Sequence, residues 1–148
     1  RGDRALHRGQ YAWDTRFASV GAEAQAGAFR LVTEGAFGDS GMGAPGGARV
    51  DVRFWSGYVL LSWAGLDERL RFTARYDRFR NEDRDGQPEP NDESGESVTV
   101  AGFFSPRPWL RLGLEVLDLR SDRKAAAFSG APADAGARRA QAELRVRF

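Results

Sequence analysis

The sequence predicts an all-β fold, namely an antiparallel up-and-down transmembrane β-barrel, and three observations lead to this prediction. Apolar and polar residues alternate with a period of two, which places them on opposite faces of a strand. The connections between the predicted strands alternate between short turns and long polar loops, as they do in membrane barrels. Aromatic residues gather near the strand ends, as in the interfacial girdles of such barrels.

The alternation is clearest over the last nine residues, where Ala140, Ala142, Leu144, Val146 and Phe148 exchange strictly with polar residues. The same period recurs upstream, and each segment reaches roughly the 9–11 residues that a membrane-spanning strand needs. An alanine-rich stretch over 125–140 is where a short helix within a loop is expected. The predicted strands cover residues 12–24, 28–38, 48–63, 67–80, 96–105, 108–120 and 137–148.

The predicted connections are short around Gly27, around Gly65 and at 106–108, and long at 39–47, 81–95 and 121–136. If the C-terminus lies on the periplasmic side, every short turn lies on that side and every long loop lies outside. Two aromatic girdles are then predicted. They consist of Trp63, Phe104, Trp109 and Phe148 on the short-turn side, and of Trp13, Phe37, Tyr76 and Phe79 toward the long loops.

Composition excludes several classes of protein. The chain has no run of about 18 apolar residues, so a transmembrane helix is excluded. It has no cysteine, so disulfides, thiolate metal sites and cysteine nucleophiles are excluded as well. A net charge of +1 gives no electrostatic reason to expect nucleic acid as a partner.

Residues 1–148 are predicted to form one domain that is the C-terminal portion of a larger barrel. Seven strands is an odd number, whereas bacterial single-chain barrels have an even number of strands and no open edge. We therefore expect further strands to precede Arg1.

Two segments, Ser56–Trp63 and Arg71–Phe79, resemble the C-terminal half of the phosphate-selective porin O/P family. The resemblance implies a sixteen-stranded, homotrimeric pore in the bacterial outer membrane, through which small anions such as phosphate diffuse passively. It also extends to Phe148, which resembles the terminal aromatic residue by which the barrel-assembly machinery recognises its substrates. The chain departs from the family pattern at Leu66-Asp67-Glu68, where a threonine-glycine-glutamate turn is typical, and it has no lysine-rich loop. Further segments that fit the same register are Ala28–Gly35, Trp109–Leu119 and Gln141–Phe148.

Arginines on the polar strand faces are the candidate pore-lining residues. A fixed guanidinium offsets the dehydration of an anion in a narrow path, and its fork matches phosphate and carboxylate oxygens. In the alternative interpretation, Glu34, Glu115 and Glu143 on the same faces neutralise the arginines in a structural charge ladder. The arginines predicted to line an anion path are Arg53, Arg71, Arg75, Arg111 and Arg145.

Two further motifs resemble functional sites but each lacks part of the required pattern. Residues 81–86 are spaced like the start of a calcium loop, but Arg84 interrupts the ligands and the glutamate at position twelve is missing. The stretch 38–41, Gly-Asp-Ser-Gly, is similar to a serine-protease turn, but its base would have to be His7 and no partner carboxylate can be assigned. We therefore predict a solvated loop and a glycine-rich loop, with no catalytic site, no metal and no cofactor.

Two other functions stay open. One is an outer-membrane barrel with a structural or binding role and a plugged lumen. The other is a soluble antiparallel barrel or sandwich that binds an apolar ligand, because a soluble sheet also alternates apolar and polar residues. For the channel, the expected partners are small anionic solutes, outer-membrane lipid and the barrel-assembly machinery.

Overall fold

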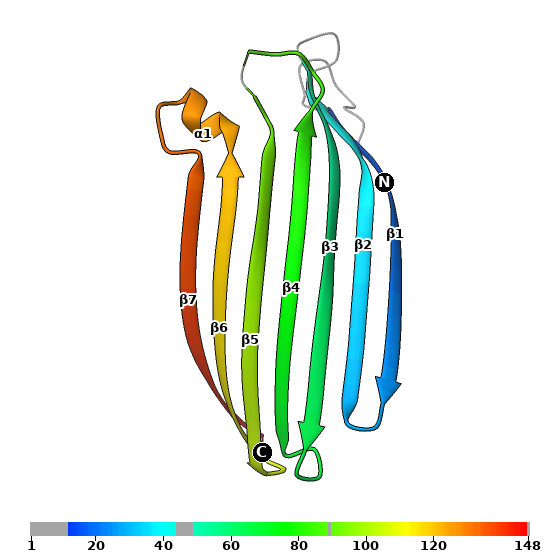
Figure 1. The fold of residues 1–148 in the computed structure, drawn as a ribbon, viewed down its shortest axis with the longest axis vertical. Helices are drawn as coiled ribbons and strands as arrows, with labels where there is room; N and C mark the ends of the chain where they lie inside the picture. Colours follow the sequence, from blue (N-terminus) through cyan, green and yellow to red (C-terminus); the bar gives the residue numbers. More distant parts are fainter. Residues whose placement is uncertain (1–11, 44–48, 89, 148) are drawn as a thin grey trace.

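A computed structural model of the chain describes residues 12–43, 49–88 and 90–147, with strand side chains from residue 14 onward. Seven strands form one antiparallel sheet in which each strand pairs with the next along the chain (Figure 1). The strands are β1 (Ala12–Ala26), β2 (Phe29–Gly43), β3 (Arg49–Gly65), β4 (Leu70–Asp83), β5 (Glu93–Arg107), β6 (Leu110–Arg123) and β7 (Asp134–Val146).

The predicted number, order and direction of the strands are confirmed, but six of the seven strands are longer than predicted, and β4 is shifted by three residues. The loop predicted over 39–47 is wrong for residues 39–43, which continue β2 to Gly43. Glycine, serine and aspartate have low β-propensity, yet pairing with Arg49–Arg53 supplies partners for their backbone groups. Pairing with β6 likewise extends the start of β5 back to Glu93.

The short turns lie at one end of the sheet and the longer connections at the other, in a single layer of strands (Figure 1). Between β6 and β7, the predicted helix is reduced to α1 (Lys124–Phe128), which has five residues. Within the described ranges, no helix has the length and apolar character needed to cross a membrane.

Cross-strand register divides the side chains into an apolar and a polar face, because residues directly opposite each other point to the same side. The apolar face is the more exposed one: Leu114 is 60% exposed and Leu144 70%. The two buried side chains of the described chain, Ala101 at 3% and Ser62 at 6%, lie on the polar face instead. The polar face is therefore the less exposed of the two. The apolar face includes Leu31, Leu61, Phe72, Val100, Leu114 and Leu144, whose partners across the strands continue this face.

The aromatic girdles are found in part. Phe37 and Tyr76 lie on the apolar face toward the long connections, and Trp55 joins them there. At the short-turn end, Trp63 stacks on Phe72 with ring centroids 6.0 Å apart. The prediction is wrong for Phe79, which lies opposite Ser56 and Gly95 on the polar face. Phe148 and the side chain of Trp13 lie outside the described residues.

The turn between β3 and β4 is conformationally strained. Leu66, Asp67 and Glu68 have φ values of 53°, 53° and 65°, a left-handed region that favours glycine. We expect Asp67→Gly to stabilise the protein by about 1 kcal/mol, because it removes the Cβ clash of one left-handed residue. Chemical unfolding of the purified protein measures the change. Asp67→Ala is the matched control, since alanine keeps the Cβ and should give no gain.

Candidate functional site

Four of the five predicted arginines share the polar face, and Arg53 does not. Arg53 lies opposite Asp39, and its Nε is 3.0 Å from the Asp39 Oδ1 on the face that carries Trp55. The prediction for Arg53 is wrong because β3 is apolar on both faces from Tyr58 onward. The local alternation around Arg53 therefore did not indicate which face continues as the polar one. The arginines that do share the polar face are Arg71, Arg75, Arg111 and Arg145.

Arg75 is neutralised by its neighbours. Its Nε donates to both carboxylate oxygens of Asp77, at 2.8 and 3.0 Å, and its guanidinium lies 4.0 Å above the ring centroid of Tyr58. These groups border a pocket of about 280 Å³ that also includes Glu34 and Phe79. At this position the charge-ladder interpretation describes the contacts well.

Arg111 and Arg145 lie directly opposite each other on β6 and β7 and share one carboxylate. The Glu143 Oε1 is 3.0 Å from the Arg145 Nε and 3.8 Å from the Arg111 Nε. The Arg111 guanidinium also lies 4.0 Å above the ring of Phe103. This ring in turn covers Gly113, where an added Cβ would lie 2.8 Å from a ring carbon. Two cations and one carboxylate leave this group with a positive charge.

Arg71 adds to this positive charge at the short-turn end of the polar face. It makes no salt bridge with any described residue, and its register partners are Ala64 and Phe103. Glu115 makes no salt bridge with Arg71, and its carboxylate accepts a hydrogen bond from Gln141 at 3.1 Å. The short-turn end of β4–β7 is therefore more basic than the middle of the polar face.

The groups that neutralise or position these arginines were not predicted from the sequence. Asp77 is two residues from Arg75 on the same strand, so the period of two already places both on one face. The contact of Arg111 with Phe103 depends on the pairing of β5 with β6, and it requires the register that only the structure supplies.

The calcium-like motif spans the end of β4 and the start of the β4–β5 connection, and the protease-like motif lies in β2. The Asp83 carboxylate accepts the backbone N–H of Asp85 at 3.0 Å and of Asn91 at 2.7 Å, so both its oxygens are engaged. No metal-holding group of three or more histidine, cysteine or acidic residues exists in the described part of the chain. Ser40 lies in a regular strand, where its hydroxyl is 2.7 Å from that of Thr15, and His7 lies outside the described residues.

Asp92 ties the β4–β5 connection to α1, which lies in the β6–β7 connection. Its carboxylate accepts a hydrogen bond from the Lys124 Nζ at 2.7 Å and another from the Asp83 backbone N–H at 3.0 Å. The Lys124 ammonium, followed by the Asp83 N–H, lowers the pKa of Asp92 below its ordinary value. This carboxylate therefore stabilises the connections above its unfolded pKa of about 4, and the stabilisation is lost as the pH falls through the lowered folded pKa.

We expect amide exchange around 92 and 124, corrected for intrinsic rates, to accelerate as the pH falls below about 4. Asp92→Asn should show the fast exchange already at pH 7, because the amide makes no ion pair with Lys124. Equal exchange of the two proteins at pH 7 would contradict the role of this ion pair.

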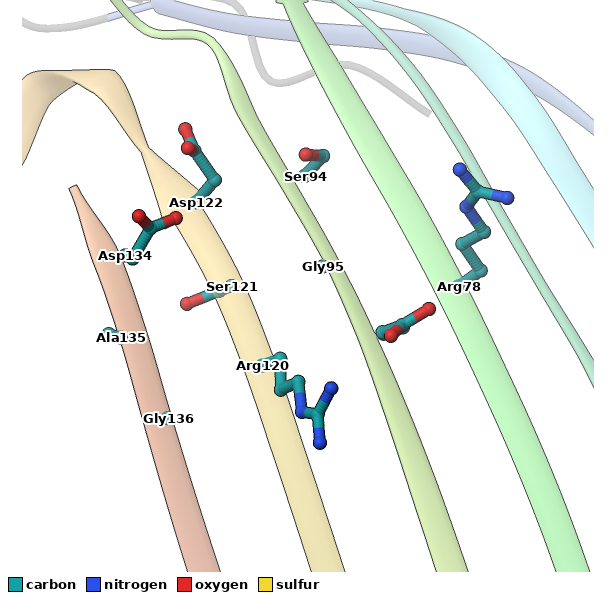
Figure 2. A pocket seen from close by; sticks show the side chains of 10 residues that line it. Arg78, Ser94, Gly95, Arg120, Ser121, Asp122, Asp134, Ala135 and Gly136 are labelled. Carbon is teal, nitrogen blue, oxygen red and sulfur yellow. The ribbon is translucent and has the colours of Figure 1, made fainter.

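A second hollow lies at the long-connection end of β4–β7 and has a volume of about 540 Å³ (Figure 2). Register places its charged lining on the same face as the apolar residues, farther toward the long connections. These residues could have been predicted from the sequence, since charged residues replace apolar ones at alternate positions toward the end of each strand. The charged residues that line the hollow are Arg78, Glu96, Arg120, Asp122 and Asp134.

Comparisons with known proteins assign no family to the chain. It matches no protein-family model, no curated protein and no solved structure. The resemblance to the phosphate-selective porin O/P family thus rests on the short motifs of the sequence alone, and the function is argued below from the geometry of the sheet.

Proposed function

We propose that this sheet is part of an outer-membrane β-barrel channel for the passive diffusion of small solutes, with anions favoured. The carrying observation is that the apolar face is the more exposed one, whereas the buried side chains Ala101 and Ser62 lie on the polar face. A soluble sheet covers its apolar face, and large uncovered apolar patches mark contact with a partner or with lipid. Membrane barrels have this arrangement, with apolar residues outward and polar residues toward the lumen.

The boundary of the apolar face toward the long connections supports the proposal, because it crosses the strands obliquely. On β1 this face is apolar up to Ala18. Following the directly opposed residues from Ala18 across the sheet leads to Asp134 on β7. On β7 it is apolar only up to Ala140, six residues from Asp134. Six residues correspond to about 20 Å along a strand, and the six strand spacings from β1 to β7 to about 29 Å. A flat boundary then implies a strand tilt of roughly 35°, within the range of membrane barrels.

The open edges of the sheet indicate how the barrel is completed. Since seven antiparallel strands alternate in direction, β1 and β7 run the same way. Direct pairing of the two edges would be parallel, so antiparallel closure requires an odd number of additional strands. The proposed barrel therefore has an even total, as bacterial barrels do. The sixteen strands implied by the family resemblance satisfy this condition.

The anion preference rests on the short-turn end of the polar face. There Arg71 has no carboxylate partner among the described residues, and Arg111 shares Glu143 with Arg145. An excess of guanidinium groups in a polar lumen lowers the energy of an anion and raises that of a cation. A hydrogen-bonding fork aimed into the lumen also suits carboxylate and phosphate oxygens.

Conductance across a planar lipid bilayer tests the proposal. We expect the reconstituted full-length protein to give discrete conductance steps, and unequal salt concentrations to give a reversal potential on the anion side. A folded, inserted protein without conductance would indicate the plugged structural or binding barrel instead. A reversal potential on the cation side would contradict the arginine path while leaving the barrel intact.

A further inference from the structure

An aromatic ring lies under one of the arginines at the short-turn end of the polar face. Phe103 on β5 and Arg111 on β6 are diagonal neighbours, because Phe103 is directly opposite Gly113, two residues from Arg111 on the same face. Diagonal neighbours are within reach when one side chain is aromatic and the other is long. The Arg111 guanidinium lies 4.0 Å from the centroid of the Phe103 ring, which is the geometry of a cation–π interaction.

Gly113 leaves the space into which this ring leans. A Cβ added at Gly113 would lie 2.8 and 2.9 Å from two carbons of the Phe103 ring. Unbonded carbon atoms pack at about 3.5–4.0 Å, so any larger residue at this position would displace the ring. The guanidinium of Arg111 would then lose the ring face that supports it. The missing side chain at Gly113 and the position of Arg111 are therefore parts of one arrangement.

Phe103 attracts Arg111 from the side opposite the second cation of this group. Arg145 on β7 lies directly opposite Arg111, and like charges in this position repel each other. Glu143 offsets the repulsion in part, since its Oε1 is 3.0 Å from the Arg145 Nε but 3.8 Å from the Arg111 Nε. Because β6 lies between β5 and β7, the ring on β5 holds Arg111 on the side away from Arg145.

The way in which Arg111 is held keeps its charge available. The face of a ring attracts a cation without supplying a negative charge, and it leaves the N–H groups in the guanidinium plane unoccupied. In the described chain Arg111 makes no hydrogen bond, its Nε included. Arg75 is the contrasting case on the same face. Its guanidinium also lies 4.0 Å from a ring centroid, that of Tyr58, but Asp77 neutralises it through hydrogen bonds of 2.8 and 3.0 Å.

We propose that Phe103 is a positioning residue for anion selectivity and that it acts through Arg111. The ring fixes the Arg111 guanidinium on the polar face, and the guanidinium donates to the oxygens of a passing phosphate or carboxylate. Gly113 is required for this role, because it makes room for the ring. The inference rests on the proposed function, since it assigns Phe103 and Gly113 to the arginine path of an anion channel.

A double-mutant cycle of Phe103→Leu and Arg111→Gln tests the inference. The readout is the reversal potential of the reconstituted full-length protein in unequal potassium chloride. Phe103→Leu alone should lower the anion-to-cation permeability ratio by about twofold, one arginine's share of a roughly tenfold preference to which three arginines contribute. In the Arg111→Gln background, the same substitution should leave the ratio unchanged, because the group through which Phe103 acts is gone. Equal effects of Phe103→Leu in both backgrounds, or no effect in either, would overturn the inference.

Three further variants separate positioning from a loss of stability. Phe103→Tyr retains the ring and should therefore retain the original ratio, whereas Gly113→Ala should lower the ratio as Phe103→Leu does. The matched control is Gly95→Ala on the same face, where an added Cβ would lie 2.5 Å from the ring of Phe79. No arginine of the described chain lies over that ring, so Gly95→Ala should destabilise the protein and leave the ratio unchanged. A lowered ratio in Gly95→Ala, or an unchanged ratio in Gly113→Ala, would contradict the positioning role.

The two proposals fail in different ways. If the unaltered protein shows no discrete conductance steps, or a reversal potential on the cation side, the anion channel is overturned and the role of Phe103 with it. If the unaltered protein is anion-selective but its permeability ratio does not depend on Phe103, only the positioning role is overturned.

Discussion

Replacing Val100 with arginine is expected to destabilise the membrane-embedded protein by about 2–4 kcal/mol, the cost of a lipid-facing arginine near the bilayer midplane. Val100 is 51% exposed on the apolar face of β5, between Ala74 and Val116. In water such a substitution at a half-exposed position changes stability little. Reversible unfolding in lipid vesicles measures the cost.

Ser97→Arg is the matched control on the same strand. Ser97 lies on the polar face, where its hydroxyl donates to the Asp77 carboxylate at 3.3 Å. An arginine there stays beside that carboxylate and faces the lumen, so its cost should be below about 1 kcal/mol. Similar costs for Val100→Arg and Ser97→Arg would contradict the assignment of the two faces.

The second large effect is expected for the triple variant in which Arg71, Arg111 and Arg145 are replaced by glutamine. Each removed charge changes the energy of an anion 4 Å away by about 1 kcal/mol in water, less after ionic screening. The anion-to-cation permeability ratio should therefore fall by roughly tenfold. Reversal potentials in unequal salt measure this ratio.

The matched control for the triple variant is Arg75→Gln with Asp77→Asn. It removes one charge of each sign from the polar face, at a pair joined by hydrogen bonds of 2.8 and 3.0 Å. The reversal potential of this control should stay near that of the original protein. If the triple variant also keeps the original reversal potential, the basic end of the polar face plays no part in selectivity.

The sheet was predictable from the sequence because its main signal is local. A period of two is visible in each strand by itself, and short turns such as the one at Gly27 specify antiparallel neighbours. The exact strand ends were not predictable. Asp39–Gly43 lack β-formers, and they are ordered as a strand by pairing with β3 rather than by their own propensity.

The candidate site was predicted less completely, because it depends on register and curvature. Arg71, Arg75, Arg111 and Arg145 were assigned to the polar face by local alternation, and the structure places them there. Arg53 was misassigned because β3 becomes apolar on both faces beyond it, from Tyr58 onward. Neither the sharing of Glu143 nor the oblique edge of the apolar face can be read from one strand, because both compare positions on different strands.

Thiol labelling along β6 in a lipid bilayer tests most directly whether the apolar face meets lipid and the polar face meets water, and it is feasible because the chain has no cysteine of its own. Single cysteines are introduced one at a time and treated with a charged, water-soluble thiol reagent. We expect labelling at Glu115, Leu117 and Leu119 on the polar face, and protection at Leu112, Leu114 and Val116 on the apolar face. Labelling of both sets at equal rates would contradict a membrane barrel with a polar, water-filled lumen.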